Sequence, residues 1–210
     1  MIKSESLRLY LCTDRGLAKG RPLLEAVEAA IAGGVTMVQL REKELSGREF
    51  FSLAREMLVL TGRYNVPLII NDRLDIALAV GAAGVHLGQD DLLLAAARRL
   101  AGKDFIIGVS AHNVEEALIA QEEGADYLGT GAVFPTGTKV VPGIIGPQGL
   151  AAVTSAVKIP VVGIGGIGPA NAAEVMAAGA SGIAVISAIL SKDDIRKAAA
   201  ELREIVEGKK

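Results

Sequence analysis

The sequence of 210 residues has few aromatic side chains, one cysteine and two histidines. Only 3% of the residues are aromatic, whereas 50% are hydrophobic, so valine, isoleucine, leucine and alanine must fill the core. Cys12 cannot form an internal disulfide, and we expect it to be a packed thiol rather than a nucleophile. Two histidines, His86 within an apolar strand and His112 at a helix start, make neither a metal site nor a catalytic triad.

Long apolar runs and blocks of one charge are also missing. The most apolar stretch, residues 76–88, is interrupted by glycines and is shorter than the roughly 18 apolar residues of a membrane-spanning helix. The N-terminus runs into strand-like sequence without a signal-peptide core. The 22 basic and 24 acidic residues are spread along the chain, which argues against a nucleic-acid partner. We therefore expect a cytoplasmic protein with no membrane or nucleic-acid partner; the oligomeric state is left open.

Short β-branched runs alternate with longer helical patterns eight times. The predicted strands are residues 7–13, 36–41, 67–71, 84–87, 105–109, 127–130, 161–165 and 182–186. Helical patterns include residues 22–32, 47–61, 113–123, 169–178 and 193–207. Strands separated by helices indicate a parallel sheet, because a parallel return needs a crossover. Eight units in so short a chain favour an α/β fold with a single (β/α)8 TIM barrel over residues 1–210, rather than an open doubly wound sheet.

A glycine run follows the seventh predicted strand. In this type of barrel the chemistry lies on the loops after the strands, and phosphate groups bind beside strands seven and eight. The glycines of residues 163–168 would let backbone N–H groups approach an anion, and Pro169 is expected to start a helix with a favourable dipole. We predict a phosphorylated ligand here; the alternative is that the glycines only form a tight turn.

Two acidic residues follow the third and fourth predicted strands. Asp72 and Asp91 are hard oxygen ligands on neighbouring loops, a combination that suits Mg²⁺. Each also precedes a helical segment, so helix capping is an equally good interpretation.

Basic residues lie on other loops of the same rim. Arg41, Lys43 and Lys139 are the kind of cations that a diphosphate requires, although a solvated surface charge is the default for any one of them. Lys139 ends the segment Thr136-Gly137-Thr138-Lys139, which combines hydroxyls, a flexible glycine and a cation in one loop. This combination favours a binding role for the loop.

Taken in chain order, these motifs resemble thiamine-phosphate synthase. The resemblance is carried by Gln39-Leu40-Arg41-Glu42-Lys43, Asn71-Asp72, Gly88-Gln89-Asp90-Asp91, Gly108-Val109-Ser110, Pro135-Thr136-Gly137-Thr138-Lys139, Gly165-Gly166-Ile167 and Val185-Ile186-Ser187. That family joins hydroxymethylpyrimidine diphosphate to a thiazole phosphate and releases diphosphate. The resemblance implies a dissociative reaction, in which Mg²⁺ assists loss of diphosphate and the thiazole nitrogen attacks the resulting cation. Such a reaction needs no protein nucleophile.

The resemblance also implies a role for each motif residue. The pyrimidine diphosphate would be held by Gln39, Arg41, Lys43, Asn71, Ser110 and Lys139, with Lys43, Ser110 and Lys139 acting in catalysis. Mg²⁺ would be bound by Asp72 and Asp91. The thiazole phosphate would be held by Thr136, Gly137, Thr138, Gly166, Ile186 and Ser187.

Three other functions compete with this interpretation. A thiazole tautomerase would share the barrel and the thiazole-phosphate site, but members of that branch lack the full metal and diphosphate set that Asp72, Asp91 and Lys139 complete here. A phosphosugar isomerase would need a paired acid and base, and the first strand offers only Asp14, without an obvious partner. A non-catalytic sensor would not need both the metal pair and the diphosphate cations.

Overall fold

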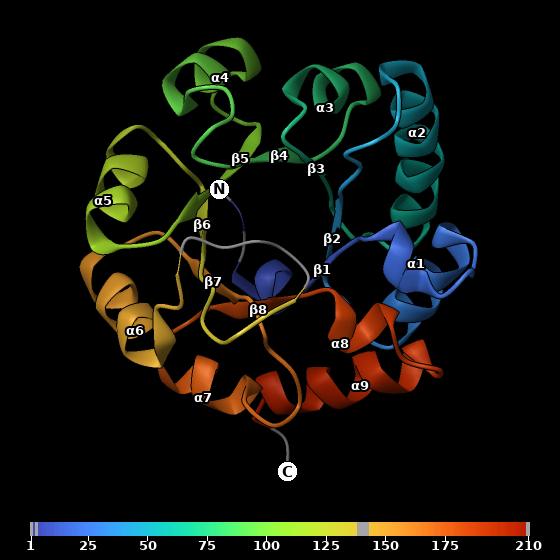
Figure 1. Cartoon of the computed structure of the whole chain (residues 1–210). Coiled ribbons are helices and arrows are strands. Elements are labelled where there is room, and N and C mark those ends of the chain that lie inside the picture. Colours follow the sequence, from blue (N-terminus) through green and yellow to red (C-terminus); the bar gives the residue numbers. More distant parts are fainter. Residues whose placement is uncertain (1, 3, 138–142, 209–210) are drawn as a thin grey trace.

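Eight parallel strands close into a barrel in the computed structural model, which describes residues 2, 4–137 and 143–208 (Figure 1). The strands are β1 (Leu9–Cys12), β2 (Met37–Leu40), β3 (Leu68–Asn71), β4 (Gly84–Leu87), β5 (Ile106–Ala111), β6 (Tyr127–Thr130), β7 (Val161–Ile164) and β8 (Gly182–Val185). Each strand pairs with its neighbours in sequence, and β1 closes the circle against β8. The predicted barrel is confirmed, and each strand lies within two residues of its predicted ends.

Helices surround the barrel on all sides (Figure 1). They are α1 (Leu23–Ala32), α2 (Gly47–Arg63), α3 (Leu74–Val80), α4 (Leu94–Ala101), α5 (Val114–Glu122), α6 (Gly146–Ala156), α7 (Ala172–Ala177), α8 (Ser187–Leu190) and α9 (Ile195–Val206). Two 3-10 turns, η1 (Ser4–Leu7) and η2 (Arg15–Ala18), flank β1. Within the described part of the chain, no helix is long and apolar enough to cross a membrane.

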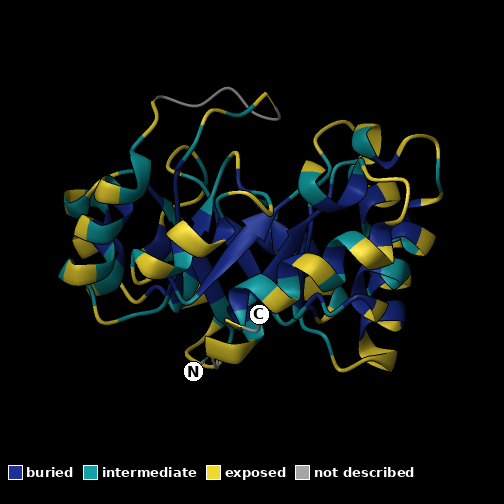
Figure 2. Ribbon diagram, turned by 90° about the horizontal axis from the view of Figure 1, so that it is seen from below, coloured by how far each residue is buried: buried dark blue, intermediate teal, exposed yellow. Residues whose placement is uncertain are grey.

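The buried side chains form two clusters, one outside the strands and one inside the barrel. Alternate residues of a strand point to opposite faces, so Leu9 and Leu11 pack toward the helices while Tyr10 and Cys12 point into the barrel. The inner cluster consists of Leu7, Tyr10, Cys12, Met37, Ile69, Tyr127, Val162 and Ala184. Figure 2 shows the result as a buried centre of strands within helices whose outer faces are exposed.

Two tyrosines occupy the barrel interior. Tyr10 and Tyr127 meet edge to face, with their ring centroids 5.9 Å apart. Glycine at position 108 makes room for one of them, because a Cβ added to Gly108 would lie 2.1 Å from Cζ of Tyr127. The small residue on β5 therefore decides how far the Tyr127 ring can extend into the barrel.

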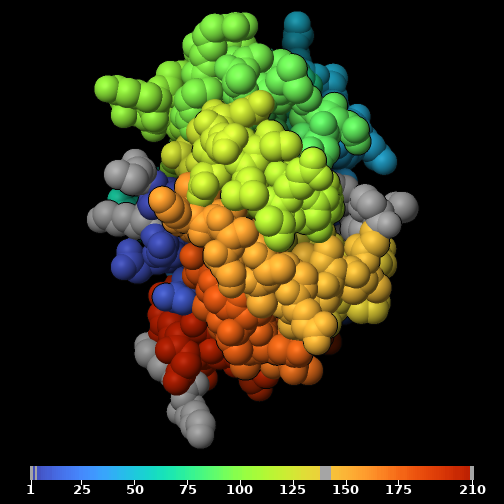
Figure 3. Space-filling model, turned by 90° about the vertical axis from the view of Figure 1, so that its left-hand side faces the viewer, coloured from blue at the N-terminus to red at the C-terminus, as the bar shows by residue number. Residues whose placement is uncertain are grey.

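Arg98 on α4 ties the helical shell to the barrel. Its guanidinium donates hydrogen bonds to the carbonyl oxygens of Phe105 (2.5 Å) and Gly124 (2.9 Å) and to the Asp126 carboxylate (2.6 Å). Asp126 also accepts a hydrogen bond from the Ile107 N–H at 2.8 Å. The pair thus joins α4 to the starts of β5 and β6. Figure 3 shows the left-hand side of the molecule in Figure 1, where the outer shell forms a continuous surface.

Candidate active site

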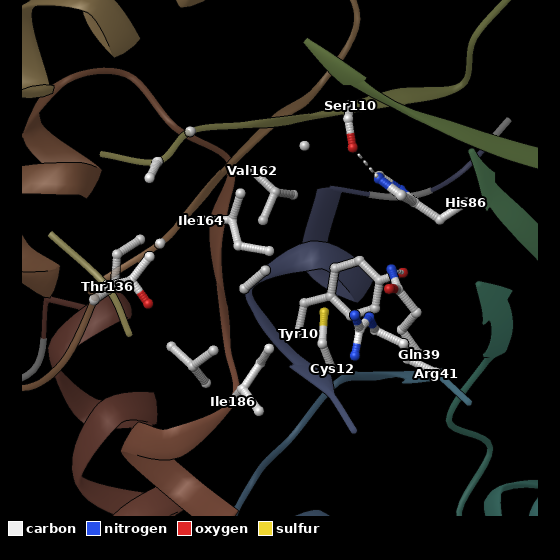
Figure 4. Close-up of a pocket in the computed structure, with 18 of the residues that line it drawn as sticks. Tyr10, Cys12, Gln39, Arg41, His86, Ser110, Thr136, Val162, Ile164 and Ile186 are labelled. Carbon is white, nitrogen blue, oxygen red and sulfur yellow. Dashed lines mark hydrogen bonds between the residues drawn. The ribbon is translucent and has the colours of Figure 1, made fainter. Parts of the chain in front are cut away.

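A pocket opens at the carboxyl ends of the strands, and every strand contributes to its lining. The strands β1 to β5 supply mainly polar side chains, which are Tyr10, Gln39, Asn71, His86 and Ser110, with Arg41 just beyond β2. The strands β6 to β8 and their loops supply mainly small or apolar residues, which include Gly129, Gly131, Ala132, Val162, Gly165, Gly166, Ala184 and Ile186. The pocket therefore has a polar half and a half of small residues (Figure 4).

Two carboxylates and a lysine meet beside the polar half. Lys43 forms an ion pair with Asp72, whose backbone lies in the left-handed region at a φ of 62° and donates a hydrogen bond from its N–H to the His86 carbonyl (2.8 Å). Asp91 accepts a hydrogen bond from the Gly88 N–H at 2.6 Å. Partial burial raises the pKa of Asp91, and the neighbouring Asp72 carboxyl raises it further, against the lowering effect of the Gly88 N–H. The two carboxylates are therefore close enough to repel each other.

The capping interpretation of these carboxylates is wrong. The helix α3 begins after Arg73 and α4 begins after Leu93, so neither Asp72 nor Asp91 occupies an N-cap position. Among the described residues no cluster of three or more potential metal-ligating side chains is present. Two adjacent carboxylates nevertheless fit Mg²⁺, which takes one or two carboxylates and completes its shell with phosphate oxygens and water.

The opposite half of the pocket is shaped by glycine. Gly165 and Gly166 both lie at positive φ, 96° and 66°, where a side chain is strained. A Cβ on Gly166 would lie 2.4 Å from the Pro135 carbonyl oxygen, so this loop packs directly on the loop after β6. The short helix α8 begins at Ser187, and Ile186 and Ser187 both line the pocket. Exposed N–H groups at a helix start are suited to a phosphate.

One expectation about this half is wrong. The helix after β7 does not begin at Pro169 but at Ala172, because Asn171 holds the preceding residues in a turn. The Asn171 side chain accepts a hydrogen bond from the Gly168 N–H (2.8 Å) and donates one to the Gly166 carbonyl (3.0 Å). The helix start that faces the pocket is therefore that of α8.

At the floor of the pocket, five side chains form a hydrogen-bonded chain across the barrel. Gln39 Nε2 donates to the Tyr10 hydroxyl at 2.9 Å, and the Tyr10 and Tyr127 hydroxyls lie 2.8 Å apart. Tyr127 contacts His86 Nδ1 at 3.0 Å, and His86 Nε2 lies 3.1 Å from Ser110 Oγ, as the dashed line in Figure 4 shows. Burial raises the pKa values of both tyrosines, so their hydroxyls stay protonated and act as hydrogen-bonding groups.

Comparison with known proteins decides the family. The family model described as "Thiamine monophosphate synthase" matches residues 9–189, nearly the whole barrel. The chain belongs to the thiamine monophosphate synthase family. The prediction from the motifs, together with the enzyme class that it implies, a transferase of thiamine biosynthesis, is thereby confirmed.

Relatives and solved structures agree with this family. A thiamine-phosphate synthase of Clostridium botulinum (strain Hall) is 56% identical over 195 residues, which cover 92% of this chain and 95% of the relative. The synthase of Clostridium novyi (strain NT) is 54% identical over 199 residues, 94% and 98% of the two chains. The thiamine phosphate pyrophosphorylase structure from Pyrococcus furiosus superposes with a TM-score of 0.90 at 45% identity and covers 98% of both chains. A 3-hexulose-6-phosphate synthase, at 20% identity and a TM-score of 0.73, shares the fold.

The structure brings together most of the residues expected to bind substrate in this family. The pocket is lined by Gln39, Arg41, Asn71, Ser110, Thr136, Gly166, Ile186 and Ser187. Lys43, Asp72 and Asp91 lie beside the pocket rather than in its lining, and Gly137 is exposed outside it. Thr138 and Lys139 lie outside the described residues.

Three buried residues at the pocket were underrated in the prediction from sequence. His86 and Tyr10 line the pocket, and Tyr127 connects them, although the surrounding pattern is that of apolar strands. The available signal was alternation: each lies at an inward-facing position of a barrel strand, between residues that pack outward. Cys12 also lines the pocket; it is 2% exposed, and burial raises the pKa of its thiol to about 12, which agrees with a packed thiol.

Proposed function

We propose that the chain condenses hydroxymethylpyrimidine diphosphate with a thiazole phosphate to form thiamine phosphate and diphosphate, with Mg²⁺ as cofactor. The observation that carries this proposal is the two-part pocket. Its polar half adjoins the carboxylates and Lys43, as a diphosphate bound through a metal requires. Its other half combines glycines at positive φ with the start of α8, as a monophosphate requires.

The polar half would bind and activate the pyrimidine diphosphate. Gln39, Asn71 and Ser110 line the wall that would hold the ring, and Arg41 lies at the rim above β2. Arg41 and Lys43 would hold the diphosphate by charge, and the family resemblance adds Lys139 to them. Mg²⁺ held by Asp72 and Asp91 would neutralise the charge that develops on the departing diphosphate.

The half of small residues would place the second substrate. Gly166, Ile186 and Ser187 would hold the thiazole phosphate, together with Thr136, Gly137 and Thr138. Reaction then depends on two correctly placed substrates and on charge neutralisation, which explains why the polar lining needs no nucleophile and base pair. Tyr10, Cys12 and Val162 line the floor of the pocket, are almost fully buried and would keep water from reaching the cation from below.

The same proposal covers location and domain organisation. The lone thiol, Cys12, favours a reducing compartment, and we infer that the enzyme acts in the cytoplasm on two phosphorylated small molecules. We also infer that residues 1–210 form one catalytic domain, because the strands that build the pocket extend from Leu9 to Val185.

The test is formation of thiamine phosphate from the two phosphorylated precursors, measured as thiochrome fluorescence after oxidation. We expect product with Mg²⁺, loss of product with EDTA and recovery when Mg²⁺ is added back in excess. Product that persists after complete chelation would contradict the role of Mg²⁺. A folded protein that forms no product under any of these conditions would contradict the proposed reaction.

A further inference from the structure

The hydrogen-bonded chain at the floor of the pocket connects two residues that are expected to touch the same substrate. It begins at Gln39 on β2, passes through Tyr10 on β1, Tyr127 on β6 and His86 on β4, and ends at Ser110 on β5. Four of the five residues are buried, so water cannot easily replace a missing partner. The donor and acceptor roles along the chain are therefore coupled from one end to the other.

The hydrogen bonds can run in only one direction when Gln39 presents its NH₂ group to Tyr10. The Tyr10 oxygen accepts from Gln39, and its single O–H has no acceptor other than Tyr127 among the described residues. The O–H of Tyr127 must then donate to His86 Nδ1. This makes His86 the tautomer protonated at Nε2, which donates to Ser110 Oγ.

We propose that Tyr10, Tyr127 and His86 are positioning residues that fix which groups Gln39 and Ser110 present to the substrate. In this arrangement the amide oxygen of Gln39 is left as an acceptor at the pocket, and the Ser110 hydroxyl, having accepted from His86, is left as a donor. Reversing either end requires reversing every hydrogen bond between them. An acceptor and a donor fixed on two walls of one pocket fit a heterocycle that carries both an amino group and a ring-nitrogen acceptor.

This inference rests on the proposed function, because it takes the aminopyrimidine diphosphate as the ligand of Gln39 and Ser110. The aminopyrimidine has the required amino donor and ring-nitrogen acceptors. The thiazole phosphate would lie in the other half of the pocket and would not sense the chain. A defect in the chain should therefore weaken use of one substrate and spare the other, whereas a general loss of packing would affect both.

The decisive variant is Tyr127→Phe, which removes the central hydroxyl and keeps the ring. We expect the KM for the pyrimidine diphosphate to rise about two- to tenfold, as loss of one well-placed hydrogen bond predicts, with the KM for the thiazole phosphate unchanged. In a Ser110→Ala background the same substitution should have a smaller effect, because the chain then orients only Gln39 at its other end. Tyr64→Phe is the matched control: Tyr64 is on the surface, its hydroxyl contacts Glu28 at 2.8 Å, and its loss should change neither KM.

A spectroscopic measurement checks the direction of the chain independently of activity. The ¹⁵N shifts of His86, assigned by loss of the signal in His86→Gln, should report protonation at Nε2 in the wild-type protein. Protonation at Nδ1 would overturn the inference, as would equal shifts in both KM values or an undiminished effect of Tyr127→Phe in the Ser110→Ala background. Failure of the wild-type protein to form thiamine phosphate would instead refute the proposed function and leave the tautomer result to be judged separately.

Discussion

Replacement of Asp72 separates a metal-binding role from a structural one, provided that the backbone at this position is considered. Asp72 lies at a φ of 62°, a conformation that asparagine tolerates well and alanine does not, with a strain of about 1–2 kcal/mol for most residues. Its ion pair with Lys43 contributes at most about 1 kcal/mol, because 53% of the lysine side chain is exposed. Asp72→Asn should therefore lower the free energy of unfolding by less than about 1 kcal/mol, and Asp72→Ala by about 1–3 kcal/mol.

Activity should respond differently from stability. Both variants lose the negative charge proposed to hold Mg²⁺, so both should reduce kcat/KM by on the order of a hundredfold. The assay is the rate of thiamine phosphate formation over a titration of Mg²⁺, combined with thermal melting, where each kcal/mol corresponds to roughly 2–4 °C for a chain of this size. Wild-type dependence on Mg²⁺ in Asp72→Asn would refute the reasoning. So would a melting temperature of Asp72→Asn that falls as far as that of Asp72→Ala.

Three further predictions follow from the site and the shell. Gly166→Ala should raise the KM for the thiazole phosphate and cost about 1–3 kcal/mol in denaturant unfolding, because of its positive φ and its close packing. Gly62→Ala, in α2 with open space around it, should leave this KM unchanged and raise the free energy of unfolding by up to about 1 kcal/mol. The pKa of the Cys12 thiol is raised to about 12, so about 1 in 10,000 of these thiols is ionised at pH 8. Iodoacetamide should therefore modify Cys12 only after unfolding. Rapid labelling of the native protein would contradict the burial of this residue. Arg98→Ala should lower the free energy of unfolding by about 3 kcal/mol, measured with urea, because it leaves Asp126 without its cation. Activity well below the melting temperature should stay the same. A variant as stable as the wild type would show that water replaces the hydrogen bonds of Arg98.

The positions of the strands could be predicted from the sequence because each strand has a recognisable local residue pattern. Apolar β-branched runs bounded by glycine, proline and asparagine fix each strand to within two residues, and eight repeats fix closure. The start of α7 was predicted incorrectly because a proline after a glycine run is compatible with both a helix start and a turn. The hydrogen bonds of Asn171 with Gly168 and Gly166 select the turn. Helix and turn propensities of single residues do not predict these contacts.

The site was less accessible from sequence than the fold. Gln39, Arg41 and Asn71 were identified because polar residues at strand ends are conspicuous. His86 was set aside because its two neighbours along β4 are apolar. Its role depends on Tyr127, which is 41 residues away in the chain and becomes its partner only when the barrel closes. That neither carboxylate caps a helix likewise became clear only from the observed helix starts.

The pocket is built by the strands and their loops, and most of the helices only surround them, which affects where mutations are tolerated. Apart from Ser187, every residue that lines the pocket lies in a strand or in the loop that follows one. The inward faces of α1 to α7 and α9 form the hydrophobic shell and their outward faces contact solvent, but none of these helices contributes to the pocket lining. Mutations that accumulate on those faces can adjust solubility, rigidity or association with other proteins while the chemistry is inherited intact. Protein engineers can use the same surface for fusion, immobilisation or redesign without altering the pocket lining.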